Sequence, residues 1–388
     1  MKLILVEPPH QEKWLPFAGA RPISELRAGA WLIRERWQAV ADDDAELIFG
    51  PEHLKTFAEQ GTPRVTGVET VEGPALIGKS EFAPTGLPVE FPNHATRLAH
   101  EGETVGWWIP EGESWSGDEH TEWPEVEVEG MILRGAFDLV TALEHFLVAD
   151  VADFISEPGD ELPDASIILG DPSEVVLLGA MVEPGVTFDV RKGAIVIEQN
   201  AYVRGGTRLA GPLYVGPGTE ISGGFVTNSA IGPACRIGGE VNTTVWLGNS
   251  NKAHYGFVGH SVIGNWVNLG AGTTTSNLKN TYGEVRISAG EETIETSRQF
   301  LGSLIGDHAK LAIGTLLNTG TIIGAGANVF GANGPAKYVP PFAWGDTGET
   351  MRKDAFITTA ERVMARRNQK VDDEVRGMLS SIYDFLTR

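Results

Sequence analysis

The fold is decided by the stretch at 304–329, whose sequence is LIGDHAKLAIGTLLNTGTIIGAGANV. Aliphatic residues recur in it at every sixth position, at Ile305, Leu311, Leu317, Ile323 and Val329. A helix repeats its buried side about every 3.6 residues and a half-buried strand every second residue, so neither has a period of six. Hexads that each form a short strand and a turn do, because three of them close one triangular coil of about 18 residues. We therefore predict a parallel β-helix in which each aliphatic side chain points inward.

The same period is found before this stretch. It places aliphatic residues at Ile197, Val203, Leu209, Val215, Ile221, Ile231, Ile237, Ile263 and Leu269. Glycine or another small residue often follows, as expected at a corner that needs a positive φ or a close approach of two backbones. A β-sandwich with many glycine turns, the alternative, would show alternation within longer strands and a turn about every 8–12 residues. The pattern favours the hexapeptide-repeat β-helix.

The repeat breaks at 242–257 and again at 277–300. Interruptions of a solenoid are usually loops on one face, and often on the binding face. The tail from about residue 358 is expected to be helical, because its apolar residues follow helical spacing. They are Val371, Val375, Met378, Ile382 and Phe385. We expect this helix to pack on its own β-helix or on a neighbouring subunit.

The first half of the chain has a different pattern. We expect buried strands at 3–6 and 44–49, an irregular segment at 62–130, and helices that begin at Ser24 and span 51–60 and 138–155. The helix after Ser24 is predicted from an apolar stripe at Leu26, Ala30, Ile33, Trp37 and Val40. Strands that alternate with helices favour a small α/β layer structure.

Charge and glycine content change at one place in the 388-residue chain. Residues 1–155 hold 28 acidic and 11 basic residues, and the rest hold 24 and 19. Of the 48 glycines, 34 follow residue 155. We therefore predict an α/β domain at 1–157, a β-helix at 158–345 and a helical tail at 346–388.

Composition excludes several classes of protein. The net charge of −22 argues against nucleic acid or an anionic membrane as a partner. No run of 18 apolar residues indicates a membrane span. The N-terminal sequence is typical of a strand rather than a secretory signal, and the single Cys235 excludes a disulfide framework, so we expect a cytoplasmic protein. The nine histidines show no metal-ligand spacing, and no P-loop, GxSxG or GxGxxG motif is present.

Two segments carry a resemblance to a known family. The run at 250–280, SNKAHYGFVGHSVIGNWVNLGAGTTTSNLKN, resembles the acetyltransferase half of the GlmU-like enzymes that make UDP-N-acetylglucosamine, and the likeness extends over about 165–345. The segment at 17–37, FAGARPISELRAGAWLIRERW, resembles the reduced nucleotidyltransferase-like domain of a divergent, mainly bacterial branch.

This resemblance implies a Rossmann-like nucleotidyltransferase domain followed by a left-handed β-helix. The β-helix would N-acetylate glucosamine-1-phosphate with acetyl-CoA, and the N-terminal domain would use UTP and Mg²⁺. Enzymes of this kind are homotrimers that hold acetyl-CoA between neighbouring prisms.

The resemblance also assigns roles to residues. His254 matches the general base that accepts a proton from the attacking amino group, a task that suits imidazole. Asn268 matches the asparagine that contacts the amino sugar. The residues that match the acetyl-CoA channel are Ala271, Gly272, Asn277 and Ser303. A backbone N–H in such a small-residue corner is a reasonable oxyanion donor.

The phosphate contacts match less well. The best-placed cations are Arg236, Lys252 and Lys279, and Lys279 stands in for a family lysine that has no clear match. Phe257 occupies the position of a family tyrosine near the sugar phosphate, so that hydroxyl is missing, and Tyr255 is the expected substitute.

The nucleotide site departs from the family pattern. The sequence at 7–10 is EPPH where the family has a GxGTR loop, and no glycine follows before Gly19. Arg21, assisted by Arg27, is the expected phosphate-binding residue, and Asn93 falls near the usual metal-binding aspartate. Turnover of nucleotide and a degenerate, structural role both remain open. So do acetyl transfer to another nucleotide sugar and a non-catalytic β-helix that serves as scaffold or sensor.

Overall fold

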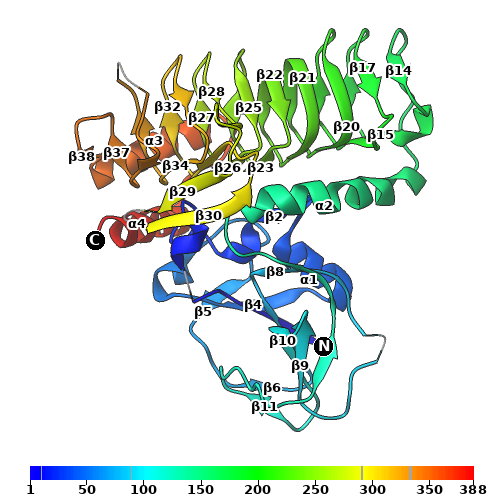
Figure 1. Ribbon diagram of the computed structural model, residues 1–388, viewed down its shortest axis with the longest axis vertical. Helices are drawn as coiled ribbons and strands as arrows, with labels where there is room; N and C mark the ends of the chain where they lie inside the picture. Colours follow the sequence, from blue (N-terminus) through cyan, green and yellow to red (C-terminus); the bar gives the residue numbers. More distant parts are fainter. Residues whose placement is uncertain (10, 89, 290–291, 332–333) are drawn as a thin grey trace.

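The computed structural model describes residues 1–9, 11–88, 90–289, 292–331 and 334–388. Figure 1 shows the coils of a β-helix side by side along one side of the molecule and an N-terminal sheet on the other, with α2 and α4 between them. We call residues 2–156 the N-terminal part. No helix among the described residues is long and apolar enough to cross a bilayer.

The N-terminal part is built on a seven-stranded sheet. In sheet order its strands are β12 (Glu125–Glu127), β9 (Thr96–His100), β10 (Glu103–Ile109), β7 (Ala75–Lys79), β1 (Lys2–Val6), β4 (Ala45–Phe49) and β5 (Arg64–Thr66). β1 pairs in parallel with both β4 and β7, and β4 with β5, so four strands end at one edge. In open α/β sheets, ligands bind outside the carboxyl ends of such strands, where the strand order reverses. Here that place lies between β1 and β7.

Short elements complete the N-terminal part. They are the hairpin β2–β3 (Arg27–Ala28, Trp31–Leu32), the antiparallel strand pairs β6–β11 (Val71–Glu72, Ser114–Trp115) and β8–β13 (Phe82–Gly86, Glu129–Ile132), the helices α1 (Ile33–Ala41) and α2 (Asp138–Ala152), and the 3-10 turns η1 (Gln11–Trp14), η2 (Ile23–Glu25), η3 (Glu52–Thr56) and η4 (Asp153–Ser156). The helix predicted at 138–155 is confirmed by α2 and η4.

Two predictions for this part are wrong. The helix predicted from Ser24 begins only at Ile33, because Gly29 has a φ of +77° and turns the β2–β3 hairpin. The apolar residues before Ile33 are buried for another reason, since they belong to the central cluster of the N-terminal part. The segment at 62–130, expected to be irregular, forms strands β5 to β12, and its Trp107 and Trp115 are buried between them.

Three columns of parallel strands form the β-helix, and we name them face A, face B and face C. Face A consists of β15 (Val175–Leu177), β18 (Ile195–Ile197), the ends of β20 (Arg208–Val215) and β21 (Glu220–Ile231), β23 (Val245–Gly248), β26 (Val262–Asn265), β31 (Ser303–Ile305), β34 (Thr321–Ile323) and β36 (Tyr338–Val339). Face B consists of β14 (Ile167–Leu169), β17 (Thr187–Asp189), the start of β20, the middle of β21, the end of β22 (Arg236–Asn242), β25 (Phe257–Gly259), β28 (Thr274–Thr275) and β33 (Leu316–Leu317). Face C consists of β16 (Met181–Val182), β19 (Tyr202–Val203), the starts of β21 and β22, β24 (Asn251–Lys252), β27 (Asn268–Leu269), β32 (Lys310–Leu311), β35 (Asn328–Val329) and β37 (Ala343–Trp344), followed by β38 (Glu349–Thr350). A 3-10 turn, η5 (Pro172–Glu174), precedes β15.

The predicted parallel β-helix is confirmed by this register. Leu304 pairs with Ile322 in the next coil, and Lys310 with Asn328. The residues of the hexad period form one continuous interior cluster, which includes Ile305 and Ile323.

Face A is apolar on both of its sides. In β18, Ile195 and Ile197 point into the prism, whereas Val196 joins a cluster shared with the N-terminal part. The outward residues of this shared cluster are Val176, Ala194, Val196, Tyr214, Ala230, Val245, Leu247, Val262, Leu304 and Ile322. They pack with α2, and full burial of each Val, Leu or Ile contributes about 1.5–3 kcal/mol. The N-terminal part and the β-helix therefore share one core.

The first predicted break of the repeat is wrong and the second is confirmed. Residues 242–257 form a regular coil, in which Lys252 pairs with Ile237 and occupies an inward position. Because a lysine occupies this inward position, the six-residue aliphatic period is interrupted in the sequence although the coil is regular. In contrast, 277–300 contains a hairpin of β29 (Val285–Ala289) and β30 (Glu292–Arg298), which packs beside β34 on face A.

The tail folds back onto its own chain. It forms two helices, α3 (Lys353–Ala365) and α4 (Asp373–Leu386), so helical structure starts a few residues before the predicted position. In α4, the ring of Phe385 stacks on His53 with 3.5 Å between centroids, and Ser381 donates to the carbonyl of His53 at 2.9 Å. These contacts hold α4 against η3 of the N-terminal part.

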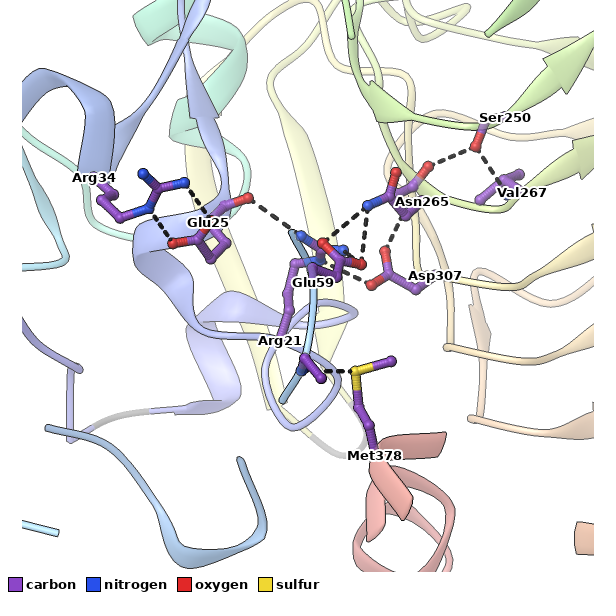
Figure 2. Close-up of polar contacts among 11 residues, drawn as sticks. Arg21, Glu25, Arg34, Glu59, Ser250, Asn265, Val267, Asp307 and Met378 are labelled. Atoms are coloured by element: carbon purple, nitrogen blue, oxygen red, sulfur yellow. Dashed lines mark hydrogen bonds and ion pairs between the residues drawn. The ribbon is translucent and has the colours of Figure 1, made fainter. Parts of the chain in front are cut away.

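A buried charge network joins the two halves of the molecule (Figure 2). Arg21 donates from Nε to Asp307 and from Nη2 to Glu59, each at 2.8 Å, and its side chain is only 2% exposed. Asn265 donates from its backbone to Asp307 at 2.8 Å and from its side chain to Glu59 at 3.1 Å. Arg21 and Glu59 belong to the N-terminal part, and Asp307 and Asn265 to the β-helix.

The edge of the sheet between β1 and β7 is closed by a carboxyl group. Glu7, directly after β1, accepts from the backbone N–H of Ile23 at 2.7 Å and of Ser24 at 3.3 Å. Burial raises the pKa of Glu7 to about 7. Glu7 thereby fixes η2 at the place where the family has its glycine-rich loop.

We predict that Arg21→Met strongly destabilises the protein. The change leaves the buried carboxyl group of Asp307 and the partly buried one of Glu59 without their cation, and breaking a buried ion pair typically costs about 3–5 kcal/mol. The urea midpoint should fall accordingly, and Arg286→Met should serve as control, because the Arg286–Glu295 pair is 64% and 59% exposed. Adding Asp307→Asn to Arg21→Met should recover part of the loss. Equal urea midpoints for Arg21→Met and Arg286→Met would contradict a central role for the network.

Glu7 should make the stability depend on pH. Its pKa is about 7 in the folded chain and 4.5 for an ordinary glutamate, so between these pH values the folded state holds a proton that the unfolded state has lost. Stability therefore falls as pH rises from about 4.5 to about 7, by about 3 kcal/mol. The Tm of Glu7→Gln relative to wild type should rise between pH 5 and pH 8, whereas the exposed Glu46→Gln should show no such trend. A flat difference for Glu7→Gln would contradict the raised pKa.

Candidate functional site

The predicted base lies at the edge between faces C and B. His254 is in the turn between β24 and β25, and its side chain is exposed. Among the described residues, no group forms a hydrogen bond with its ring. The turn that follows in the next coil is 270–273, so His254 lies beside a small-residue corner formed by Ala271 and Gly272.

Lys252 holds the turn of His254 from inside the prism. Its ammonium group donates to the carbonyl of His254 at 2.9 Å and to that of Gly238 at 2.7 Å. The residue is 1% exposed, and burial lowers the pKa of Lys252 to about 8. This position does not suit the predicted phosphate contact, because the cation is enclosed by the coil and engaged by backbone carbonyls. Lys252 instead fixes the backbone that carries the imidazole.

Tyr255 and Gly272 connect the two stacked corners. The N–H of Gly272 donates to the carbonyl of Tyr255 at 2.9 Å. Gly272 has a φ of +79°, and a Cβ there would lie 3.2 Å from the Tyr255 hydroxyl. Since this N–H is engaged, the free donor of the corner is the N–H of Ala271, for which the described residues supply no acceptor.

Asn277 and Phe257 lie together on the face B side of this edge. A Cβ on Gly259, between them, would collide with the ring of Phe257 and come within 3.0 Å of Nδ2 of Asn277. The Asn277 amide donates to Nδ1 of His260 at 2.8 Å. Burial lowers the pKa of His260, which favours the neutral ring that accepts this bond. The ring of His260 also stacks on Phe300, with 5.2 Å between centroids.

The β29–β30 hairpin connects the group formed by Asn277, His260 and Phe300 to the N-terminal part. Arg298, at the end of β30, pairs with Glu144 of α2 at 2.6 Å and also donates to Thr141. Two residues later, Phe300 contacts His260. The surroundings of Asn277 are therefore connected to α2.

Two predicted residues lie away from His254. Ser303 is fully buried at the start of β31, where its N–H donates to Ser261 at 2.9 Å. Because Ser303 is fully buried, its hydroxyl group is not accessible to solvent. Lys279 donates to the carbonyl of Glu284. Burial, and after it the charge of Lys279, lowers the pKa of Lys337, so these two cations lie near each other beyond Asn277.

Arg236 and Asn268 lie together on face C. Both line a cavity of about 300 Å³ between this face and α3. The Asn251 amide donates to Oδ1 of Asn268 at 2.7 Å, and Arg236 lies 3.8 Å from Glu220. The structure therefore separates the predicted substrate residues into two groups, one beside His254 and one below α3.

The residues expected to bind nucleotide are not at the sheet edge. Arg21 is neutralised by two carboxyl groups, and Arg27, 7% exposed, donates to the carbonyl of Ala30. Both line a cavity of about 490 Å³ between the N-terminal part, the β-helix and the C-terminal helices. A different cavity of about 200 Å³ lies at the edge itself, and its cations are Lys13, Lys79 and Arg134. The expectation for Arg21 and Arg27 at this edge is therefore not supported.

The residues do not fit a magnesium ion. Asn93 is exposed in the loop before β9. Across the described ranges, no group of three or more His, Cys, Asp or Glu side chains could hold a metal. Glu7, directly after β1, is buried against backbone amides, and Glu103 of the edge cavity is paired with Arg134. We derive no step through Mg²⁺.

Sequence reasoning missed several cations for identifiable reasons. Lys79 is the last residue of the apolar strand β7, whose carboxyl end marks the sheet edge, but β7 lies in the segment taken to be irregular. Lys310 lies in a regular hexad. Arg366 and Arg367 belong to the tail, and nothing in their spacing indicates that α3 returns to face C.

Comparisons with known proteins agree with the predicted resemblance. Residues 3–157 match the family model described as sugar nucleotidyl transferase. A "Bifunctional sugar-1-phosphate nucleotidylyltransferase/acetyltransferase" of Sulfurisphaera tokodaii is 35% identical over 151 residues, which cover 36% of each chain. A "Bifunctional protein GlmU" of Methanocaldococcus jannaschii is 26% identical over 214 residues, which cover 50% of this chain and 49% of that protein.

One solved structure is also similar. A hexapeptide transferase family protein from Anaplasma phagocytophilum matches 52% of this chain and 91% of its own, at 17% identity and a TM-score of 0.26. The alignments with the two curated relatives span about a third to a half of their length. The chain is thus similar to GlmU-like bifunctional proteins, and its residues 3–157 match the sugar nucleotidyl transferase family.

Proposed function

We propose that the chain is an acetyl-CoA-dependent N-acetyltransferase of UDP-N-acetylglucosamine synthesis, with glucosamine-1-phosphate as acceptor. The observation that carries this proposal is the exposed imidazole of His254 beside the small-residue corner at Ala271. The names of the similar proteins supply the substrate class.

The proposed reaction is an acyl transfer. The amino nitrogen of the sugar attacks the thioester carbonyl carbon, His254 accepts the proton lost from nitrogen, and the C–S bond then breaks. The proton passes from His254 to the leaving thiolate, which gives the amide and free CoA. In this proposal the N–H of Ala271 donates to the oxyanion of the intermediate.

Oligomerisation belongs to the same proposal. Exposed apolar side chains follow the edge that carries His254, with Tyr255 74% exposed, Ile313 80% and Leu316 63%. Monomeric proteins rarely leave such a stripe open to water. We propose that a second copy of the chain covers this edge in a homotrimer and encloses the thioester.

UTP-dependent uridylyl transfer is the second candidate function. The family match at 3–157 favours it. The cavity at the sheet edge contains the cations Lys13, Lys79 and Arg134. Lys79 pairs with Glu119 at 2.9 Å and Arg134 donates to Glu103 at 2.7 Å, so Lys13 is the cation on which this candidate rests. Release of pyrophosphate from UTP and N-acetylglucosamine-1-phosphate, and its loss in Lys13→Gln, would support this activity.

We predict that His254→Ala lowers kcat for thiol release from acetyl-CoA with glucosamine-1-phosphate. Loss of a general base typically reduces the rate about 10²- to 10⁴-fold. His145→Ala is the matched control, because His145 is exposed on α2 and remote from the edge. Equal rates for wild type and His254→Ala would remove His254 as the base. Absence of thiol release with any amino sugar would contradict the acetyltransferase itself.

A further inference from the structure

The cavity between face C and α3 has an unusual charge composition. Four of its lining residues are cations, namely Arg236 of β22, Lys310 of β32, and Arg366 and Arg367 at the end of α3. No carboxylate lines it within the described part of the chain. The nearest recorded acid contact is the 3.8 Å distance from Arg236 to Glu220.

The arginines of the cavity repel one another. Burial and the neighbouring charges of Arg236 and Arg366 lower the pKa of Arg367. Burial lowers the pKa of Lys310 to about 7, with Asp307 acting in the opposite direction. Arg366 has no ion-pair partner among the described residues. Like charges held together in this way are stabilised when an anion enters between them.

The polar groups of the cavity are mostly donors. The Lys310 ammonium donates to the carbonyls of Trp266 and His308, each at 2.7 Å, which leaves one of its three N–H groups. The Asn251–Asn268 bond uses the oxygen of Asn268 and leaves the NH₂ of Asn268 without an acceptor among the described residues. A phosphoryl group, with its strong acceptor oxygens and negative charge, is complementary to these donors.

We propose that this cavity binds a phosphoryl group and that the two arginines of α3 close it over the ligand. The identity of the ligand rests on the proposed function, which offers two sources of the group: the sugar phosphate and the phosphates of acetyl-CoA. The position of Asn268 in the cavity favours the sugar phosphate, because Asn268 pairs with Asn251, which lies three residues before His254.

The test measures, by calorimetry, the equilibrium binding of phosphate-containing ligands to the full chain. The ligands are inorganic phosphate, glucosamine-1-phosphate and 3′,5′-ADP, which carries the phosphates of the nucleotide end of CoA without the thioester. The double variant Arg366→Gln/Arg367→Gln should weaken phosphate binding about 10- to 100-fold, since it removes two charge-assisted contacts. Lys310→Met should weaken it as well. The matched control is Arg362→Gln, an exposed arginine on the same helix that does not line the cavity.

The three ligands distinguish the two possible sources of the phosphoryl group. Binding and acetyl transfer, measured together, distinguish the cavity proposal from the proposed function. Loss of glucosamine-1-phosphate binding in the double variant, with 3′,5′-ADP unaffected, assigns the site to the sugar phosphate; the reverse assigns it to the coenzyme. An unchanged Tm shows that the variant folds. His254→Ala should bind phosphate like wild type, so a chain that binds phosphate but transfers no acetyl group contradicts the proposed function alone.

Two results would overturn the cavity assignment. One is phosphate affinity that is equal in wild type and the double variant, and the other is absence of binding by all three ligands. In kinetics, the double variant should raise KM for the sugar phosphate and leave kcat near the wild-type value, which separates binding of the phosphate from the role of His254.

Discussion

The arrangement of the molecule depends on the seam between the N-terminal part and face A. Arg21 crosses this seam to Asp307 at 2.8 Å, and the same Asp307 accepts the backbone N–H of Asn265. Around this network, the outward side chains of face A pack with α2 and the β29–β30 hairpin. A buried ion pair specifies geometry more than it adds stability, whereas the apolar burial supplies the favourable free energy. The seam also positions α3 and α4, because α4 packs on η3 while α3 returns over face C.

The β-helix was predictable because its constraint is local and repeats. Each coil needs one inward aliphatic residue per face, so aliphatic residues recur at every sixth position. Neither a helix nor an ordinary strand has this period. The prediction failed at 242–257, where Lys252 satisfies backbone carbonyls inside the prism instead of filling it with an aliphatic side chain. The N-terminal strands were harder, since β5 to β12 are short and lie in a segment with Gly, Pro and acidic residues throughout. What fixes them is pairing with strands far along the chain.

The candidate site was predictable where one turn contains it. His254, Tyr255 and Ala271 are close in sequence or one coil apart, so a resemblance over 31 residues brings them together. Arg21 was expected to bind phosphate because the resemblance places a basic residue ahead of the N-terminal helix, but its partner Asp307 is 286 positions away. Contacts between residues so far apart in the sequence depend on how the parts of the chain pack together, so no local sequence pattern predicts them. The same holds for Arg366 and Arg367.

The two-sided apolar character of face A has a consequence for how the chain can be divided. An isolated β-helix would present a flat parallel sheet of valine, isoleucine and leucine side chains to water, and an isolated N-terminal part would lose the surface that covers α2. Exposed surfaces of this kind drive self-association. Expression of either half alone should therefore yield aggregates, and the chain is best regarded as one cooperative body despite its two architectures.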